Sequence, residues 1–158
     1  MLIETPAQHE YYLRKMVINP PKDLLEQGFT YQAVLLLAQS FEVYGAYFDN
    51  KPFRASAQSL KRFRLAIENL FGYNYHKANI GNQLYKQLRS SYIHTLLPSE
   101  RLLILDDGLA KDHLKLNNGV ITIIPTILHK DVKTAGNILI QKLHDSTIKP
   151  KRISSSIS

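Results

Sequence analysis

Arg89, Ser90 and His94 are the residues whose types and spacing could support a defined reaction. A histidine exchanges a proton near neutral pH, and an arginine binds a phosphate with two N–H groups and stabilises charge on phosphorus. Ser90 could orient the phosphate or the imidazole by hydrogen bonding. The three side chains could therefore promote attack of an RNA 2′-hydroxyl on its own phosphate without a metal ion. One copy supplies one histidine, so two copies across a two-fold axis would supply both an acid and a base.

A helix expected over residues 80–97 places these three residues on one surface. Apolar residues at four-residue steps predict the face that packs against the core: Ile80, Leu84, Leu88 and Tyr92. At about 100° per residue, Arg89 and His94 border the opposite face, which also carries Ser90. We expect this face to be either solvated or used by a partner.

The same residues also have a structural interpretation. His94 lies near the C-terminal end of the expected helix, where an imidazolium interacts favourably with the helix dipole. Arg89 could be a surface residue that pairs with Glu100 or another acid. In that case the surface is only an interface.

Basic side chains are concentrated in the middle of the chain. The formal net charge is +7, and residues 51–101 carry 9 basic and 2 acidic side chains, whereas residues 1–50 carry 3 and 6. Such a segment attracts phosphate backbones or acidic partners. Four of its residues are expected to contact RNA: Lys61, Arg62, Arg64 and Lys86. The alternative is a solvated basic surface without a ligand.

Hydrophobic periodicity predicts a mainly α-helical protein, an antiparallel four- to five-helix bundle with a small β-hairpin inserted before the C-terminal helix. Asn19-Pro20-Pro21 is expected to end the first helix. Asn118-Gly119, between two β-rich runs, predicts the hairpin. The segment Ala33–Ala38 is apolar on all sides, which favours a central position or a subunit interface. The expected helices cover about residues 6–17, 22–48, 53–71, 80–97 and 126–143.

The chain is expected to form one domain over residues 1–148. Its core bundle covers about residues 22–99, and the hairpin and last helix cover about residues 102–145. The basic tail, residues 149–158, has no core-forming pattern and is expected to be disordered. Tyr73, Tyr75 and His76 could stack on bases beside Lys77, or they could cover one end of the bundle.

Several functional classes lack the residues that they need. The chain has no Cys, which excludes disulfides, thiolate metal sites and a cysteine nucleophile. It has no Gly-rich phosphate loop, no serine elbow and no histidine pair at metalloprotease spacing, so we expect no cofactor and no metal. No apolar run is long enough to span a bilayer, and the first residues lack the apolar segment of a signal peptide. A cytoplasmic protein with no membrane partner is expected.

The order of elements and residues resembles the HEPN superfamily over about residues 22–99. The resemblance rests on the long helix with GFTYQAVLLLAQSFEVYGAYF, the basic helix after it and the helix with LYKQLRSSYIHTLLPS. The family motif is Arg, a polar residue and then a short gap to His, which Arg89, Ser90 and His94 match. Ser90 stands where the family more often has Asn, Asp or His. Glu42 resembles a family acid on the long helix.

This resemblance implies a small helical bundle, often dimeric, with either of two functions. Many members are metal-independent endoribonucleases of toxin and antiviral systems, which implies here a homodimer that contacts RNA, cleaves it at Arg89 and His94, and has an antitoxin partner. Other members lack activity and act beside nucleotidyltransferases. They imply a non-catalytic binding or assembly module, or a substrate-binding partner of a nucleotidyltransferase. The resemblance leaves both functions open.

Overall fold

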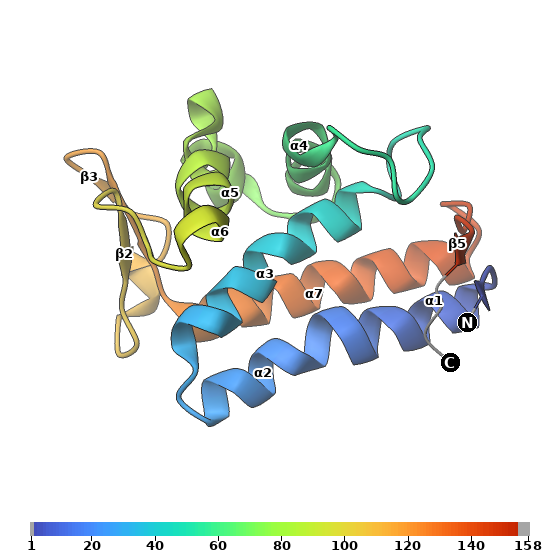
Figure 1. The fold of residues 1–158 in the computed structure, drawn as a ribbon, viewed down its shortest axis with the longest axis horizontal. Helices are drawn as coiled ribbons and strands as arrows, with labels where there is room; N and C mark the ends of the chain where they lie inside the picture. Colours follow the sequence, from blue (N-terminus) through green and yellow to red (C-terminus); the bar gives the residue numbers. More distant parts are fainter. Residues whose placement is uncertain (1, 155–158) are drawn as a thin grey trace.

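Three helical segments lie side by side along the length of the molecule (Figure 1). The computed structural model describes residues 2–154, most of which are helical, so the prediction of a mainly α-helical protein is confirmed. None of the helices in this described part has the length and apolar character needed to cross a membrane. The three segments are a continuous N-terminal rod, formed by α1 (Pro6–Tyr12), η1 (Leu13–Ile18) and α2 (Asn19–Glu26), then α3 (Thr30–Gly45), and α7 (Pro125–His144).

The N-terminal rod begins at a capping box and passes through two prolines. The side chain of Thr5 accepts from the Gln8 backbone N–H, and the Gln8 side chain accepts from the Thr5 N–H. The expected end at Asn19-Pro20-Pro21 is wrong, because helical residues continue to Glu26. The segment before the prolines is a π-helix, in which Asn19 N–H bonds to Arg14 O. A wider turn there relieves the clash between each proline ring and the carbonyl four residues earlier.

A glycine separates α2 from α3, where one helix over residues 22–48 was expected. Gly28 has φ of +81°, a conformation that glycine adopts without steric cost. Its N–H bonds to Leu25 O, and Phe29 N–H bonds to Leu24 O at 2.8 Å. These two bonds form a Schellman motif that ends α2 and turns the chain into α3.

Helix α3 lies at the centre of the molecule, in contact with α2, α4 and α7. Val34, Leu37, Phe41 and Tyr44 have no exposed surface. The Tyr44 hydroxyl donates to the Val132 carbonyl of α7 at 3.1 Å, which satisfies the only polar atom of a buried ring. The apolar segment Ala33–Ala38 therefore packs mostly inside one copy of the chain, as its central position predicts.

The helices that carry the basic segment lie above α3 in Figure 1. Residues 80–97 do not form one helix, because Gly81 and Asn82 both have positive φ. The predicted inward face is confirmed for Leu84, Leu88 and Tyr92, which are fully buried, but Ile80 is 70% exposed. The helical segments here are α4 (Ser59–Leu70), α5 (Tyr73–Ala78), η2 (Ile80–Asn82), the π-helix η3 (Tyr85–Ser90) and α6 (Ser91–Thr95).

The predicted hairpin is present before α7, within a three-stranded sheet. Asn117 and Val120 are paired across Asn118 and Gly119, both with positive φ, as a tight hairpin turn requires. The apolar run at residues 102–105 supplies the third strand, which lies parallel to the second hairpin strand. The order is β2 (Leu102–Ile104), β4 (Val120–Ile123), β3 (Leu116–Asn117).

The C-terminal segment returns to the start of the chain. Strand β5 (Ile153–Ser154) pairs antiparallel with β1 (Leu2–Ile3), and Ile153 is buried. The prediction of a disordered tail is therefore wrong for residues 149–154. The prediction did not take into account that an isolated apolar residue, here Ile153, can be buried against a segment distant in sequence. Residues 155–158 of the predicted tail lie outside the described part.

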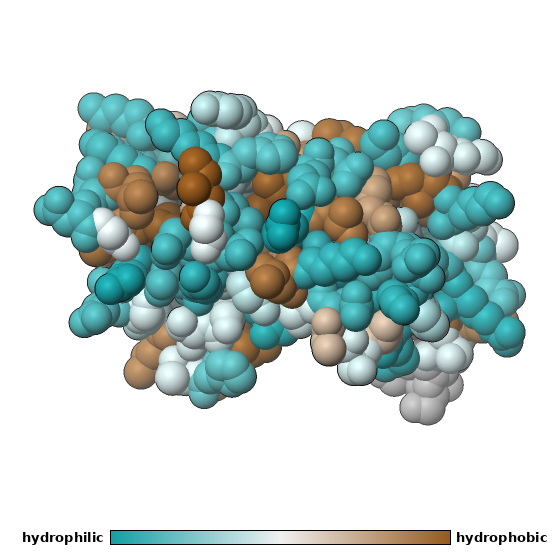
Figure 2. Space-filling view, turned by 90° about the horizontal axis from the view of Figure 1, so that it is seen from above, coloured by the Kyte–Doolittle hydropathy of each residue, from teal (hydrophilic) through white to brown (hydrophobic). Residues whose placement is uncertain are grey.

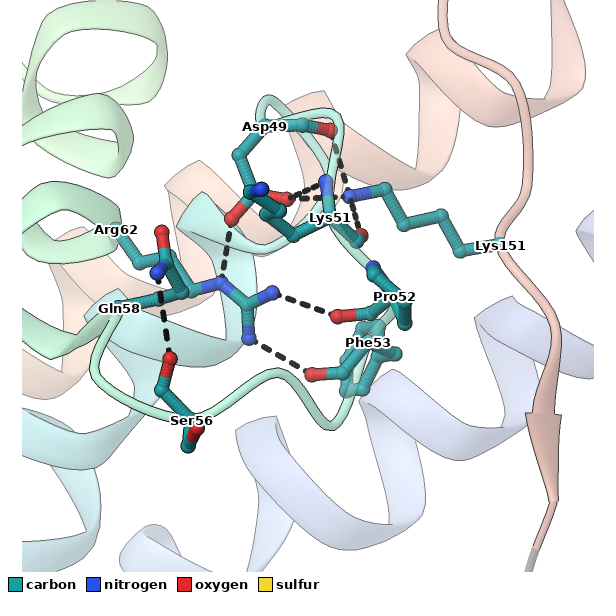
Figure 3. A network of polar contacts seen from close by, with 8 residues as sticks. All are labelled: Asp49, Lys51, Pro52, Phe53, Ser56, Gln58, Arg62 and Lys151. Carbon is teal, nitrogen blue, oxygen red and sulfur yellow. Dashed lines mark hydrogen bonds and ion pairs between the residues drawn. The ribbon is translucent and has the colours of Figure 1, made fainter.

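A buried carboxylate joins α3, α4 and this C-terminal segment (Figure 3). Asp49, just after α3, accepts from Arg62 Nε at 2.7 Å and from Lys151 Nζ at 2.7 Å. Burial by itself raises the pKa of Asp49, but the hydrogen bonds from Arg62 and Lys151 lower it to about 2. The remaining nitrogens of the Arg62 guanidinium donate to the carbonyls of Phe53 and Pro52.

Gly45 allows α3 and α4 to cross closely enough for this cluster to form. A Cβ at Gly45 would lie 1.8 Å from the Arg62 carbonyl oxygen. We expect Gly45→Ala to lower the free energy of unfolding by about 2–4 kcal/mol in urea titrations, since backbone cannot yield as a side chain does. Gly72 is the control, because a Cβ there meets nothing within 4 Å, and Gly72→Ala should cost less than about 1 kcal/mol. Equal losses in both variants would contradict the close crossing.

Candidate functional site

Arg89 forms an ion pair with Glu42, and this pair joins η3 to α3. The two side chains are only 17% and 11% exposed. Gln39, one turn earlier on α3, lies 3.5 Å from the second carboxylate oxygen of Glu42. The partner of Arg89 is therefore Glu42 and not Glu100. The family acid suggested by the HEPN resemblance is in contact with the motif arginine.

His94 lies one short helix further along the chain and is exposed, whereas Ser90 is half-buried. Arg89 and Ser90 belong to the π-helical turn, and His94 belongs to α6, which ends at Leu96 in a left-handed conformation. The positions predicted from 100° per residue do not apply through the π turn. The His94 side chain makes no hydrogen bond or ion pair with another residue of the described range 2–154.

Tyr92 fixes the position of η3 and α6 along α3. Its ring is fully buried, and its hydroxyl donates to the Tyr31 carbonyl at 2.7 Å, at the start of α3. The two contacts, Tyr92 with Tyr31 and Arg89 with Glu42, hold η3 and α6 against α3 at two points. Chemically, the arrangement offers a positioned guanidinium on η3 and an exposed imidazole on α6.

The four basic residues expected to contact RNA do not share one surface. Lys61, Arg64 and Lys86 are exposed, and the face above α4 and α6 is mostly hydrophilic with separate apolar areas (Figure 2). The expectation for Arg62 is wrong, because it is 6% exposed and its guanidinium is held by Asp49 and two carbonyls (Figure 3). Three of its five N–H groups are bonded within the protein, and a side chain buried in this way is not accessible to a phosphate backbone.

The aromatic segment after α4 divides into an exposed and a buried part. Tyr73 is 77% exposed, whereas Tyr75 is 4% exposed. The Tyr75 hydroxyl donates to Asp131 at 2.8 Å and lies 3.1 Å from His113 Nε2. Tyr75 therefore covers the end of the core, as the alternative interpretation holds, and it is not free to stack on a base.

His113 is the centre of a polar network that sequence reasoning missed. The Ile124 backbone N–H donates to His113 Nδ1 at 3.1 Å, so Nε2 carries the proton and faces Tyr75. Burial lowers the pKa of His113 to about 4, although the nearby Asp131 carboxylate opposes the shift. The three side chains come from α5, the loop before the hairpin and α7, and no local sequence pattern could have indicated that they meet.

In the described residues 2–154, no three His, Asp or Glu side chains lie close enough to hold a metal ion.

A second feature that the sequence did not indicate is a cavity of about 630 Å³ between the N-terminal rod and α3, which has Glu42 in its wall. Glu42 thus faces both this cavity and Arg89.

Comparison with protein-family models, curated proteins and solved structures gives no match to this chain. The resemblance to the HEPN superfamily therefore rests on the motif residues and the order of the helices.

Protonation of His113 should couple stability to pH. The folded-state pKa of about 4 lies below the usual value of 6.5, so the unfolded chain binds the proton more readily. The stabilisation is complete above about pH 6.5 and is lost as the pH falls to about 4, which amounts to about 3 kcal/mol. Urea titrations across this interval measure the loss.

His113→Gln should flatten this pH dependence, because an amide does not titrate. Burial also lowers the pKa of His9, so a smaller slope of the same sign should remain. His76 is exposed and provides the matched control, His76→Gln. The assignment to His113 is contradicted if both variants keep the pH profile of the unmodified chain.

Proposed function

We propose that the chain is an RNA-contacting, HEPN-like homodimer that cleaves RNA without a metal ion, with Arg89, Ser90 and His94 as its site. The observation that carries the proposal is the Arg89–Glu42 ion pair. Glu42 engages Nε, and the terminal nitrogens of the guanidinium form no hydrogen bond to another described residue. A guanidinium fixed on one side can present its other N–H groups to a phosphate.

The exposed imidazole of His94 supplies the proton chemistry. In the proposed step, His94 of one copy takes the proton of the RNA 2′-hydroxyl, and the 2′-oxygen attacks the adjacent phosphorus. The bond to the 5′-oxygen breaks, and His94 of the second copy protonates that oxygen. Arg89 stabilises the charge that develops on the phosphate oxygens. The products are a 2′,3′-cyclic phosphate end and a 5′-hydroxyl end.

Exposed apolar residues near His94 support a dimer interface at the end of α6. Leu96 and Leu97 are 62% and 63% exposed just beyond His94, and Tyr31 at the start of α3 is 49% exposed. Large apolar side chains grouped on a surface favour contact with a partner. The apolar segment of α3 gives less support, since only Leu36 within it is exposed.

A non-catalytic binding or assembly module is the second candidate, favoured by the burial of the same ion pair. A nearly buried Arg89–Glu42 pair stabilises the contact between η3 and α3 whether or not RNA is present. Removal of one partner leaves an uncompensated charge of low exposure. Arg89→Ala is therefore expected to destabilise the fold, and a loss of activity in that variant alone would not distinguish the two functions.

Cleavage is tested with labelled structured RNA in the presence of a chelator, with cyclic phosphate ends as the product. His94→Ala should lower the rate at least about 100-fold with little change in melting temperature, because His94 is exposed. His144→Ala, which removes an exposed histidine of α7, is its control. For Arg89, the double variant Glu42→Gln with Arg89→Gln is compared with Glu42→Gln alone, and the double variant should be at least about 100-fold slower.

Sedimentation of the same samples at micromolar concentration should show a dimer. A monomer would remove the two-histidine site. Cleavage that persists in both the His94 and the Arg89 variants would identify a contaminating nuclease. RNA binding without any cleavage by the unmodified chain would support the non-catalytic module.

RNA affinity should depend on salt through the exposed basic residues. Lys61→Ala with Arg64→Ala should reduce the slope of log K against log salt by up to about 1.4, which corresponds to two lost contacts with single-stranded RNA. Fluorescence anisotropy between about 50 mM and about 200 mM salt measures this slope. Lys130→Ala with Lys133→Ala removes the same charge from α7 and should leave the slope unchanged. Equal effects of the two pairs would show a non-specific charge effect.

A further inference from the structure

We propose that the cavity between the N-terminal rod and α3 binds a small hydrophobic carboxylic acid, with its apolar body inside and its carboxylate held by Lys15 and Arg54. The cavity volume is about 630 Å³, within the range of small-molecule sites. This inference rests on the cavity alone and does not depend on the proposed cleavage of RNA.

Apolar side chains from five segments form most of the cavity wall. Met16 comes from η1, Val43 comes from α3, and Ala46 and Phe53 come from the segment after α3. The paired strands β1 and β5 close one side with Ile3 and Ile153, both buried. Met16 is 56% exposed, and its flexible thioether chain can adapt to the shape of a ligand. Such a wall favours a ligand with an aliphatic chain, because binding removes the apolar surfaces of both from water.

The charged groups in the wall fall into two classes. Glu42 is paired with Arg89, and Arg62 is paired with Asp49, so these charges are compensated within the protein. Lys15 and Arg54 form no ion pair with any residue in the described range 2–154. The uncompensated charge of the cavity is therefore positive, and its complement is an anion.

Neighbouring groups hold both cations beside the cavity. Lys15 Nζ donates to the Tyr11 hydroxyl at 2.8 Å, and Arg54 Nη2 donates to the Ser154 carbonyl at 3.2 Å. Tyr12 and Arg54 both line the cavity, and the Arg54 charge opposes the rise that burial causes in the pKa of the Tyr12 hydroxyl. Each cation keeps further N–H donors for a carboxylate.

The pairing of the polar wall residues favours an aliphatic body over a polar one. The Gln39 amide approaches Glu42, and Glu42 already accepts the Arg89 charge. A ligand that needed several hydrogen bonds would have to compete with these contacts, whereas a hydrocarbon does not. An alkyl carboxylate therefore satisfies both the apolar wall and the two cations.

Calorimetric titration of the full chain with butanoate, hexanoate and octanoate tests the apolar body. Each added methylene should tighten binding about fourfold until the cavity is filled. Octanol, which has the same chain length as octanoate but no charge, should bind at least about tenfold more weakly. Butanoate that binds as tightly as octanoate, or octanol that binds as tightly as octanoate, overturns the proposal.

Matched variants locate the site. Lys15→Gln with Arg54→Gln should weaken octanoate binding at least about tenfold, whereas Lys130→Gln with Lys133→Gln, which removes the same charge from α7, should not. Val43→Phe fills the cavity and should weaken octanoate binding by a similar factor. Leu36→Phe enlarges an exposed residue of the same helix outside the cavity and should have no effect.

The remaining comparisons keep the test valid if one variant misfolds and distinguish a free carboxylic acid from a membrane surface. The cation variants change only exposed side chains, so they remain informative if Val43→Phe fails to fold. Octanoate affinity that is equal in all variants places the ligand elsewhere and overturns the proposal. Co-sedimentation with vesicles of anionic phospholipid, without any binding of free octanoate, identifies a membrane surface as the ligand and also overturns it.

Discussion

The buried carboxylate of Asp49 is the constraint on which the rest of the structure depends. A charge removed from water must be compensated where it lies, because an unpaired buried carboxylate costs several kcal/mol. Arg62 and Lys151 provide this compensation from α4 and from the C-terminal segment. The cluster therefore determines where α4 crosses α3, with Gly45 at the crossing, and where the end of the chain returns to the N-terminus (Figure 3).

A second ion pair, Arg89 with Glu42, holds η3 against α3. It fixes the π-helical segment that precedes the exposed His94, and it gives Arg89 a defined orientation. The same pair explains why a structural role and a chemical role are hard to separate at this position. The bond from Arg89 Nε to Glu42 serves either role. The terminal nitrogens, which bond to no other described residue, are needed only for the chemical role.

Helix α3 thus connects two candidate sites through one residue. Glu42 contributes to the wall of the cavity and holds Arg89, so a ligand in the cavity would lie against the carboxylate that orients the arginine. The paired strands β1 and β5 place Ile3 and Ile153 in the wall of this cavity. The ordered C-terminal segment is therefore part of the candidate binding site as well as part of the fold.

The sequence by itself determined the features that depend on neighbouring residues. These include the hairpin at Asn118-Gly119 and the inward face of Leu84, Leu88 and Tyr92, because turn chemistry and periodicity act over a few positions. It also indicated Arg89 and His94 as candidate catalytic residues.

Only the tertiary structure decided which charges are free and which are buried. Arg62 looks like its exposed neighbours in the sequence, and Lys151 lies in a polar tail, yet both meet Asp49 from 13 and 102 positions away. The partner of Arg89 and the cavity beside Glu42 likewise depend on contacts between distant segments. Such contacts follow from the compensation of buried charge, which no local pattern in the sequence encodes.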